Sequence, residues 1–455
     1  MQTSQTPGFG HGLARRLQAN RLTRRDTLWL FGASTAVVTL QGCATSPVTG
    51  QRILVGLTPD QERQIDSQQS PHQFSQDMGA VQDDGINRYV AQVGQRLQAG
   101  VQRTDMPYSY RVLNANYVNA YTFPAGAMGV TRGIVTDLKD ESELAALLGH
   151  ELGHVNARHA AQRQGQALVA QVAVVGLTVA AGASDSGWSP LLVGLGGQIG
   201  ASALLSKYSR DHEREADSLG QRYMVNAGYP ASGMTGLHQL LVEGHQRQPG
   251  LLETMFSSHP MSTERRDTAQ RLASTTYAAS AGASPQRERF MDSTAGLRRI
   301  KPTITACQNG ETALAKKALP AAQEQFTLAL AQTPRDYPAN LRMAQCLQAQ
   351  GKLQEAQRYA RTAREVYPQE AQAMKLAATL KLGLRDPAGA HAELQDYDRV
   401  LPGDPGVLFL KGVSQEGMGN RPLAAQHFAA YLRTQQQGGA AQYAGARLKD
   451  WGYLK

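Results

Sequence analysis

The apolar residues of the first third of the chain follow helical spacing. Ile86, Val90, Val93 and Leu97 recur at intervals of four, three and four residues, which predicts one face of an amphipathic helix within 61–99. Such a face is buried against other elements in a folded protein. The region that begins at about residue 61 is therefore expected to form a globular domain.

Strand-like residues dominate the next section. The run Tyr108–Val118 is rich in β-forming residues, and a second run, 128–133, follows a turn of Pro, Ala and Gly at 124–126. A long helix is then predicted from Asp140 to Gln166, with leucines along its apolar side. This order of elements predicts a small sheet followed by a helix.

Residues 165–206 are almost free of charge. Asp185 is their only charged residue, and two apolar runs, 167–182 and 188–205, flank a polar loop. Each run is shorter than the roughly 20 residues of a membrane span. We expect a helical hairpin here, and the sequence leaves open whether it packs on the core or dips into a membrane surface.

The last third of the chain repeats with a period of 34 residues. Four series of residues keep this frame: Pro334, Pro368 and Pro402; Ala322, Ala356, Ala390 and Ala424; Phe326, Ala360, Leu394 and Phe428; Ala329, Ala363, Tyr397 and Tyr431. This period resembles the tetratricopeptide repeat, whose helix pairs stack because one pair cannot bury its apolar face alone. An α-solenoid is predicted over 301–455, after a small and polar linker at 276–300.

Composition limits the number of domains and the kinds of partner that the protein can have. The 455 residues suffice for two or three domains of about 150 residues each. The net charge of +9 lies partly at the N-terminus, and no basic block with interleaved aromatic residues occurs, so nucleic acid is not an expected partner. Cys307 and Cys346 would either bridge the first two repeats in an oxidising compartment or remain buried and unpaired.

The N-terminus has the layout of an export signal over residues 1–42. A basic segment precedes an uncharged stretch, Thr27 to Gly42, that is too short for a good membrane span. The following Leu40-Gln41-Gly42-Cys43 resembles a bacterial lipobox, which implies lipidation of Cys43 and a tether over 43–60. Ala44 after it resembles an outer-membrane address, whereas 23–28 resembles a twin-arginine signal only in part, so the export route stays open.

The pattern His150-Glu151-Leu152-Gly153-His154 carries the candidate chemistry. Positions i and i+4 share one face of a helix, so both imidazoles can reach one zinc ion. Glu151 between them can take a proton from an attacking water. The sequence therefore predicts the core of a zinc hydrolase site.

A third protein ligand is expected, because two histidines rarely hold a catalytic zinc. Glu213 and Asp217 are four residues apart and share a helix face. If that helix crosses the first, Glu213 can bind the metal while Asp217 accepts a hydrogen bond from a ligand imidazole. The alternative is a solvated acidic helix with no ligand.

Further residues carry a resemblance. GHELGHVNARH followed by HEREADSLG resembles the gluzincin-type metallopeptidase family of HtpX and the CAAX prenyl protease, and with the repeats it is similar to BepA-like periplasmic peptidases. The resemblance implies Zn²⁺ ligands at His150, His154 and Glu213. It also implies a fold that is mainly α: an α+β peptidase domain over 61–275, with a small sheet and an active-site helix, followed by the α-solenoid.

Two other segments match the same family. Asn119-Ala120-Tyr121 is similar to a motif that leads into a substrate-pairing edge strand, and we expect substrate contacts at Asn119, Met128 and Val130. The alternative for Asn119 is that it only forms a turn. Ser258-His259-Pro260 with Arg265 is similar to an element that faces the active site. His259 is expected to ligate zinc in a resting state, to stabilise charge on the substrate oxygen together with Arg265, or to cap a helix.

The expected function is that of a lipid-anchored, gated periplasmic zinc endopeptidase. Its substrates would be unfolded or misassembled proteins, with the repeats binding clients or outer-membrane assembly machinery. The alternative from another class is a lipoprotein chaperone or scaffold with little proteolysis. A non-peptidase zinc hydrolase has no support beyond the metal site.

Overall fold

The computed structural model describes residues 42–168, 207–247 and 249–454. They fall into two compact units, one from the chain up to Glu62 together with 157–199, and one from 63–156 together with 200–455. The export signal and most of the expected hairpin, 169–206, lie outside the described residues. Within the described part, no helix has the length and apolar character needed to cross a membrane.

The smaller unit contains a hairpin in the segment expected to be a tether. Strands β1 (Cys43–Thr45) and β2 (Arg52–Leu54) pair antiparallel, with Cys43 opposite Leu54. In the same unit the Arg158 guanidinium contacts the Glu62 carboxylate at 3.2 Å, and both side chains are buried. Cys43 is exposed, which leaves its thiol accessible.

Two helices open the larger unit. Helix α3 (Pro59–Gln76) begins in the smaller unit, and α4 (Asp84–Gln98) starts at the N-cap Asp83, whose carboxylate accepts from two main-chain N–H groups. The predicted apolar face of α4 is confirmed, because its four residues are at most 3% exposed: Ile86, Val90, Val93 and Leu97.

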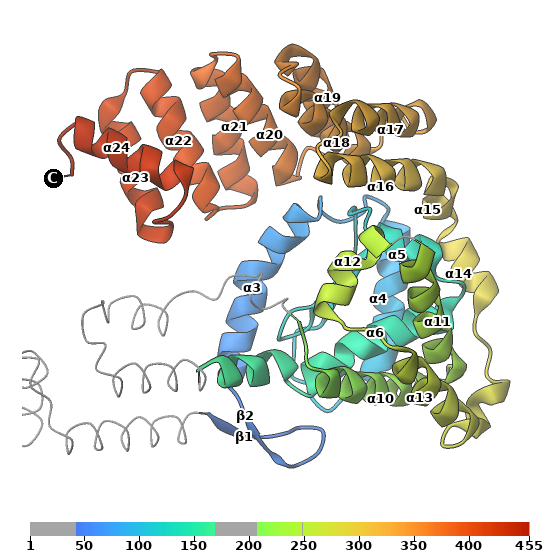
Figure 1. Ribbon diagram of the computed structural model, residues 1–455. Coiled ribbons are helices and arrows are strands. Elements are labelled where there is room, and N and C mark those ends of the chain that lie inside the picture. The colour runs from blue at the N-terminus through green and yellow to red at the C-terminus, as the bar shows by residue number, and fades with distance from the viewer. Residues whose placement is uncertain (1–41, 169–206, 248, 455) are drawn as a thin grey trace, which may run out of the picture. The chain divides into compact units, whose positions relative to one another are not determined.

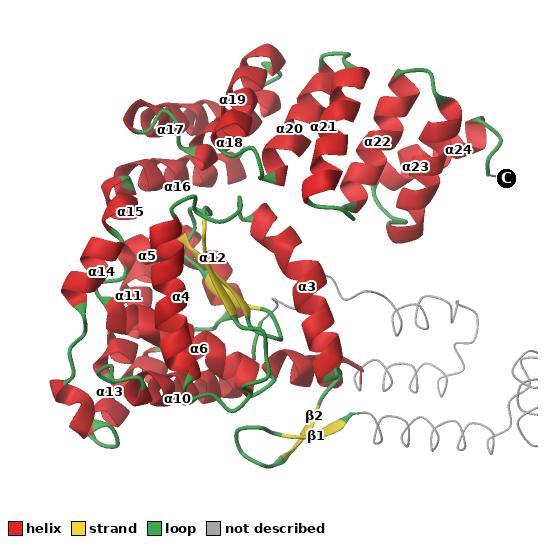
Figure 2. Ribbon diagram, turned by 180° about the vertical axis from the view of Figure 1, so that it is seen from behind, coloured by secondary structure: helices red, strands yellow, loops and turns green. Residues whose placement is uncertain are grey.

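A three-stranded sheet follows, in the order β3-β5-β4. Its strands are drawn in yellow between α4 and α3 in Figure 2. Strand β5 (Ala127–Thr131) lies in the centre, parallel to β3 (Ser109–Leu113) and antiparallel to β4 (Ala120–Thr122). All five residues of β5 are buried. Because both sides of β5 are paired, β3 and β4 are the edges of the sheet.

The long helix expected over Asp140–Gln166 is interrupted. After α5 (Arg132–Asp137), helix α6 covers Glu141–Asn156, and Arg158 then takes a left-handed conformation at φ 59° before helical residues resume at 159. The Asn156 amide donates to the Leu152 carbonyl and accepts from the Arg103 N–H at 2.8 Å, which fixes the end of α6. No Gly or Pro marks this break in the sequence.

Four helices complete this region: α10 (Arg210–Asn226), α11 (Ser232–Arg247), α12 (Pro249–Ser258) and α13 (Thr263–Ser274). Helix α10 packs closely against α6, and α11 packs against both α6 and α13. Figure 1 shows α6, α10 and α13 close together in green tones. These contacts bring the two candidate motifs onto neighbouring helices.

The segment 276–300, predicted from its composition to be a small and polar linker, contains regular structure. It contains a 3-10 turn, η1 (Ala278–Gly282), and two short helices, α14 (Arg287–Ser293) and α15 (Ala295–Arg299). Phe290 and Leu297, seven residues apart, are 0% and 6% exposed. These two apolar anchors hold the segment in place, which composition alone could not reveal.

The α-solenoid is confirmed as stacked helix pairs (Figure 1). Its helices are α16 (Lys301–Ala315), α17 (Leu319–Gln332), α18 (Tyr337–Ala349), α19 (Leu353–Val366), α20 (Ala371–Gly383), α21 (Pro387–Val400), α22 (Pro405–Gly417), α23 (Arg421–Thr434) and α24 (Gly439–Asp450). The four repeat alanines, Ala322, Ala356, Ala390 and Ala424, are each 0% exposed. Cys307 and Cys346 are buried in one apolar cluster and are not bonded to each other.

The first repeats pack directly on the sheet region within the larger unit. Arg132, which follows β5, is 1% exposed and contacts the Asp336 carboxylate at 2.7 and 3.1 Å. Its guanidinium also donates to Asn116 Oδ1 at 2.9 Å. One repeat further on, Glu370 accepts a hydrogen bond from Ser75 Oγ at 2.5 Å. Buried polar contacts therefore join the repeats to the preceding region.

Candidate metal centre and active site

Glycines allow the two motif-bearing helices to cross at close range. A Cβ atom at Gly149 would lie 2.9 Å from the Gly220 carbonyl oxygen, and one at Gly153 would lie 2.7 Å from that of Ala216. Gly153 belongs to the His-Glu motif on α6, and Ala216 lies between Glu213 and Asp217 on α10. The close crossing therefore sets the acidic pair of α10 against the histidines of α6.

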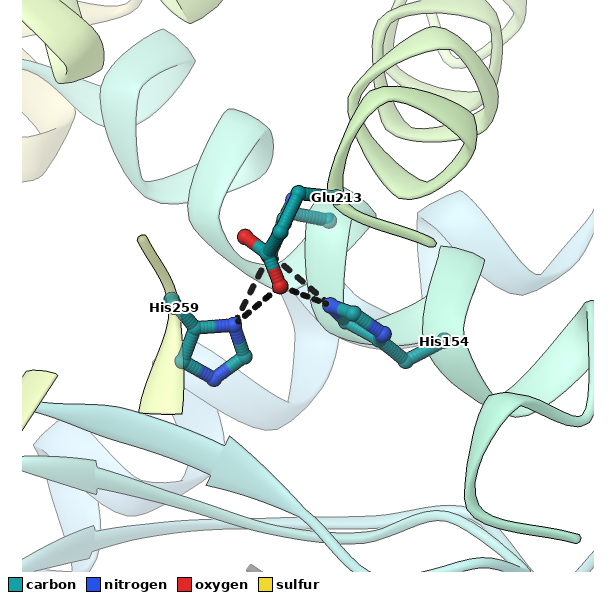
Figure 3. A group of neighbouring side chains, drawn as sticks. His154, Glu213 and His259 are labelled. Atoms are coloured by element: carbon teal, nitrogen blue, oxygen red, sulfur yellow. Dashed lines mark hydrogen bonds and ion pairs between the residues drawn. The ribbon is translucent and has the colours of Figure 1, made fainter. Parts of the chain in front are cut away.

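Four buried side chains converge there: His150, His154, Glu213 and His259. Their ligand atoms all lie within 4.8 Å of one another. Glu213 Oε1 is 3.4 Å from His154 Nε2 and 3.1 Å from His259 Nδ1 (Figure 3). The structure thus brings together three predicted ligands and adds the histidine expected to regulate them.

The spacing of these atoms suits a tetrahedral metal ion. Ligands about 2.0–2.1 Å from zinc stand about 3.3 Å apart at tetrahedral angles. His150 Nε2 lies 3.1 Å from His154 Nε2, 3.3 Å from His259 Nδ1 and 3.6 Å from the Glu213 carboxylate. Three imidazoles and one carboxylate are also a donor set that zinc accepts. The residues present therefore fit a metal ion.

Glu151 stands beside this group without a partner of its own. Its side chain is 1% exposed, and among the described residues neither carboxylate oxygen has a hydrogen-bond partner. Burial raises the pKa of the Glu151 carboxyl. The nearest charged contact is His259 Nε2, at 3.8 Å. A buried carboxylate left open next to a metal group has the placement of a general base.

Asp217 and Arg265 support the group from behind. Asp217 Oδ1 lies 2.9 Å from His150 Nδ1, which leaves Nε2 of that ring to face the metal group. Arg265 donates to both Asp217 oxygens at 2.6 and 2.7 Å and to Glu213 Oε2 at 2.7 Å. Burial opposes ionisation of Asp217, but the Arg265 charge outweighs it and holds the pKa of that carboxyl well below its usual value.

These contacts change the interpretation of Arg265. It was expected to help stabilise charge on the substrate oxygen. Its three nitrogens instead contact Glu213, Asp217 and the carbonyl oxygen of Pro260. Arg265 therefore orients two carboxylates and does not lie where it would contact the substrate oxygen.

The strand expected to receive substrate is corrected. Met128 and Val130 lie on β5, where both edges are paired and both side chains are 0% exposed. A further strand cannot add to a central strand. Strand β4 is an edge, and Asn119 immediately precedes it with its Oδ1 atom buried and without a partner among the described residues. An added strand of substrate can therefore pair with the edge strand β4 but not with β5.

The sequence profile of peptidase family M48 matches residues 86–273, which include all four members of the metal group. Residues 86–273 form a peptidase family M48 domain. The match confirms the family and the class of enzyme, a metallopeptidase, that the motifs indicated.

Several curated proteins are similar to this chain. Metalloprotease YcaL of Escherichia coli (strain K12) is 27% identical over 251 residues, 53% of this chain and 95% of YcaL. The beta-barrel assembly-enhancing protease of the same strain is 26% identical over 41% of this chain. Mitochondrial metalloendopeptidase OMA1 of Schizosaccharomyces pombe is 31% identical over 39% of this chain and 50% of OMA1. The aligned part spans only 38–40% of the beta-barrel assembly-enhancing proteases.

Solved structures of repeat proteins resemble the chain with lower sequence identity. The crystal structure of PilW, a type IV pilus biogenesis factor, is 18% identical and covers 46% of this chain and 97% of that chain, at a TM-score of 0.31. YrrB, a TPR protein, is 14% identical and covers 45% of this chain and 97% of that chain, at 0.30. The assignment of the repeats rests on the observed helix pairs.

The sequence motifs did not identify two residues that lie near the metal group. His238 on α11 places Nε2 3.2 Å from Asp217 Oδ1. The Tyr208 ring stacks on His154 with centroids 3.9 Å apart, and the main-chain N–H of Tyr208 donates to the Ser258 carbonyl at 3.0 Å. Neither residue belongs to a spaced motif, so only the folded arrangement identifies them.

Proposed function

We propose that this chain is a zinc endopeptidase that hydrolyses peptide bonds in unfolded or misassembled envelope proteins. The observation that carries the proposal is the convergence of His150, His154 and Glu213 beside Glu151, a buried carboxylate without a partner among the described residues. When bound at these ligands, zinc supplies a Lewis acid that polarises a carbonyl and lowers the pKa of a water toward about 7.

The chain's own residues then move protons and hold geometry. Glu151 takes the proton of the attacking water and returns it to the leaving amine. Its raised pKa suits a group that must carry this proton between two steps. Asp217 fixes the tautomer of His150, and Arg265 fixes the carboxylates of Glu213 and Asp217.

Substrate binds as an extra strand on β4. The Asn119 carbonyl accepts from the Thr131 N–H, and the Phe123 N–H donates to the Ala127 carbonyl, so residues 119 and 123 face β5. Main-chain groups alternate in direction along an antiparallel strand, which turns those of Ala120 and Thr122 toward the open edge. Main-chain pairing of this kind selects extended segments, as unfolded proteins offer, more than a fixed sequence.

His259 gates the site. Its Nδ1 lies inside the metal group, 3.1 Å from Glu213 Oε1, in a place that water or substrate must occupy during hydrolysis. Catalytic zinc sites keep one position open, whereas four protein ligands are typical of structural sites. His259 therefore leaves the group before turnover, and from a displaced position it can stabilise charge on the substrate oxygen.

The same observation favours a second function. If His259 stays in place, the chain acts as a lipoprotein chaperone or scaffold with little proteolysis. In both cases we propose a bacterial periplasmic location with an outer-membrane anchor at lipidated Cys43. The repeats then bind clients or components of the outer-membrane assembly machinery.

The His259→Ala variant separates these functions. It would be compared with the unchanged chain in soluble form, beginning after Cys43, using fluorescently labelled β-casein as an unfolded substrate. A gated peptidase predicts faster cleavage by His259→Ala at equal zinc content. Full zinc occupancy without cleavage by either protein would favour the scaffold.

A further inference from the structure

A hollow of about 100 Å³ lies beside the metal centre and the open edge of β4. Tyr121 and Thr122 of β4 form one side, and Thr254 and Ser257 of α12 form another. His259 also lines it. A side chain of a strand added to β4 would thus meet this hollow next to the reacting bond.

One buried carboxylate organises a wall of the hollow. Asp77 is 5% exposed and accepts hydrogen bonds from the Tyr117 hydroxyl at 2.7 Å and the Tyr121 hydroxyl at 2.5 Å. The Gln73 amide donates to the same carboxylate at 3.1 Å. All three donors belong to side chains that line the hollow. Their polar ends are therefore directed at Asp77, and their positions are set by one residue.

The described part of the lining offers no carboxylate, ammonium or guanidinium group to a substrate. Among the described residues that form the hollow, none is Lys, Arg, Asp or Glu. A charged side chain that entered would lose hydration without an ionic partner, which is strongly unfavourable. The volume equals roughly that of three waters at about 30 Å³ each, and it is smaller than the cavity of about 150 Å³ that takes benzene.

We propose that this hollow is a subsite for a short, uncharged side chain of the substrate, with its walls positioned by Asp77. The inference rests on the proposed peptidase function and deepens it by naming a specificity. Because side chains of a strand point alternately to opposite faces, only every second residue can enter. One fixed position relative to the cleaved bond should therefore favour residues such as Ala, Ser, Thr and Val.

The test places a charge at the exposed rim and looks for its effect in the cleavage sites. Thr254 is exposed, so Thr254→Lys and Thr254→Glu should fold normally. Thr327, an exposed residue of α17, gives the matched control Thr327→Lys. Each protein would digest β-casein, in the unchanged chain and in the His259→Ala background, and mass spectrometry would map the cuts.

The subsite predicts opposite shifts at one substrate position. Thr254→Lys should enrich acidic residues and Thr254→Glu basic residues there, each about two- to fivefold, the effect of an exposed ion pair. Thr327→Lys should leave the pattern unchanged. Cleavage with identical sites in all variants would overturn the subsite alone, whereas absence of cleavage in every variant would overturn the peptidase function and the subsite with it.

Asp77→Asn tests the positioning role. It should redistribute the cuts and raise KM more than it lowers kcat, because the walls move while the metal group stays intact. An equal loss at every cleavage site, with KM unchanged, would show only a structural contribution of Asp77 and would contradict its role in specificity.

Discussion

The Asp336→Asn substitution separates two interactions made by one carboxylate. Asp336 caps α18 by accepting from the Ala339 N–H at 2.9 Å, and it pairs with Arg132 through both oxygens. Asn caps helices about as well as Asp, so the substitution preserves the cap and removes the negative charge. The predicted effect is a loss of stability that comes from the ion pair.

The size of the loss follows from burial. Arg132 and Asp336 are 1% and 6% exposed. Burial alone would lower the pKa of Arg132, but the negative charge of Asp336 outweighs burial and raises that pKa. Arg132 therefore stays charged. Removing one partner of a buried pair typically costs about 3–5 kcal/mol. Asn116 and the amide oxygen introduced by Asp336→Asn would still accept some hydrogen bonds from Arg132. We therefore expect a loss of about 3 kcal/mol, the lower end of that range.

Asp404 provides a matched control two repeats later. It caps α22 by accepting from the Gly406 N–H and pairs with Lys375 at 2.6 Å, but the Lys375 side chain is 31% exposed. A pair open to solvent contributes about 0.2–1 kcal/mol. Asp404→Asn should therefore cost about 2 kcal/mol less than Asp336→Asn by these estimates.

Urea unfolding followed by circular dichroism measures this difference through the shift of the midpoint at constant slope. The double variant Arg132→Met/Asp336→Asn, which lacks the buried charge, should recover part of the loss. Equal destabilisation by Asp336→Asn and Asp404→Asn, or no recovery in the double variant, would refute the idea that a buried ion pair holds the first repeats on the M48 domain.

Three further predictions concern the site and its helix. Asp217→Asn should weaken metal binding about 10- to 100-fold because the acceptor that orients His150 loses its negative charge, and unchanged affinity in a chelator competition would contradict this. Glu151→Gln should retain the metal but lower kcat on β-casein by about 10²–10⁴. Burial opposes ionisation of Glu141, but hydrogen bonds led by Arg289 outweigh it and keep its pKa low. The contribution of Glu141 to the free energy of unfolding should be complete above the unfolded pKa of about 4.3 and lost as pH falls through the folded pKa. Glu141→Gln should therefore make the free energy of unfolding less dependent on pH in the acid range.

The hydrophobic periodicity predicted correctly which residues of a helix are buried, because this feature depends on residues close in sequence. The face of α4 and the repeat positions marked by Ala322 and Phe326 were predicted correctly, because burial on a helix follows a 3.6-residue period. The convergence of Glu213 on His150 and His154 followed from motif spacing and family resemblance. The helix face and the repeat positions require no knowledge of distant contacts, whereas the convergence of Glu213 on the histidines needed the family resemblance.

Features that depend on distant contacts were missed. The end of α6 is set by Asn156 binding the 102–103 main chain, and the order of strands is set by the pairing of β5 on both sides. His238 contacts Asp217 and Tyr208 stacks on His154, and neither residue belongs to a motif that the sequence could reveal. The packed segment 276–300 likewise depends on where Phe290 finds its partners.

The central claim, that Glu151 acts as the base of a metallopeptidase, is tested most directly by one comparison. The chain beginning after Cys43 and its Glu151→Gln variant would each be loaded to the same zinc content and incubated with labelled β-casein, in the His259→Ala background as well. We predict cleavage by the Glu151 proteins and loss of that cleavage in the variants. Equal cleavage by both, at equal zinc content, would contradict the account.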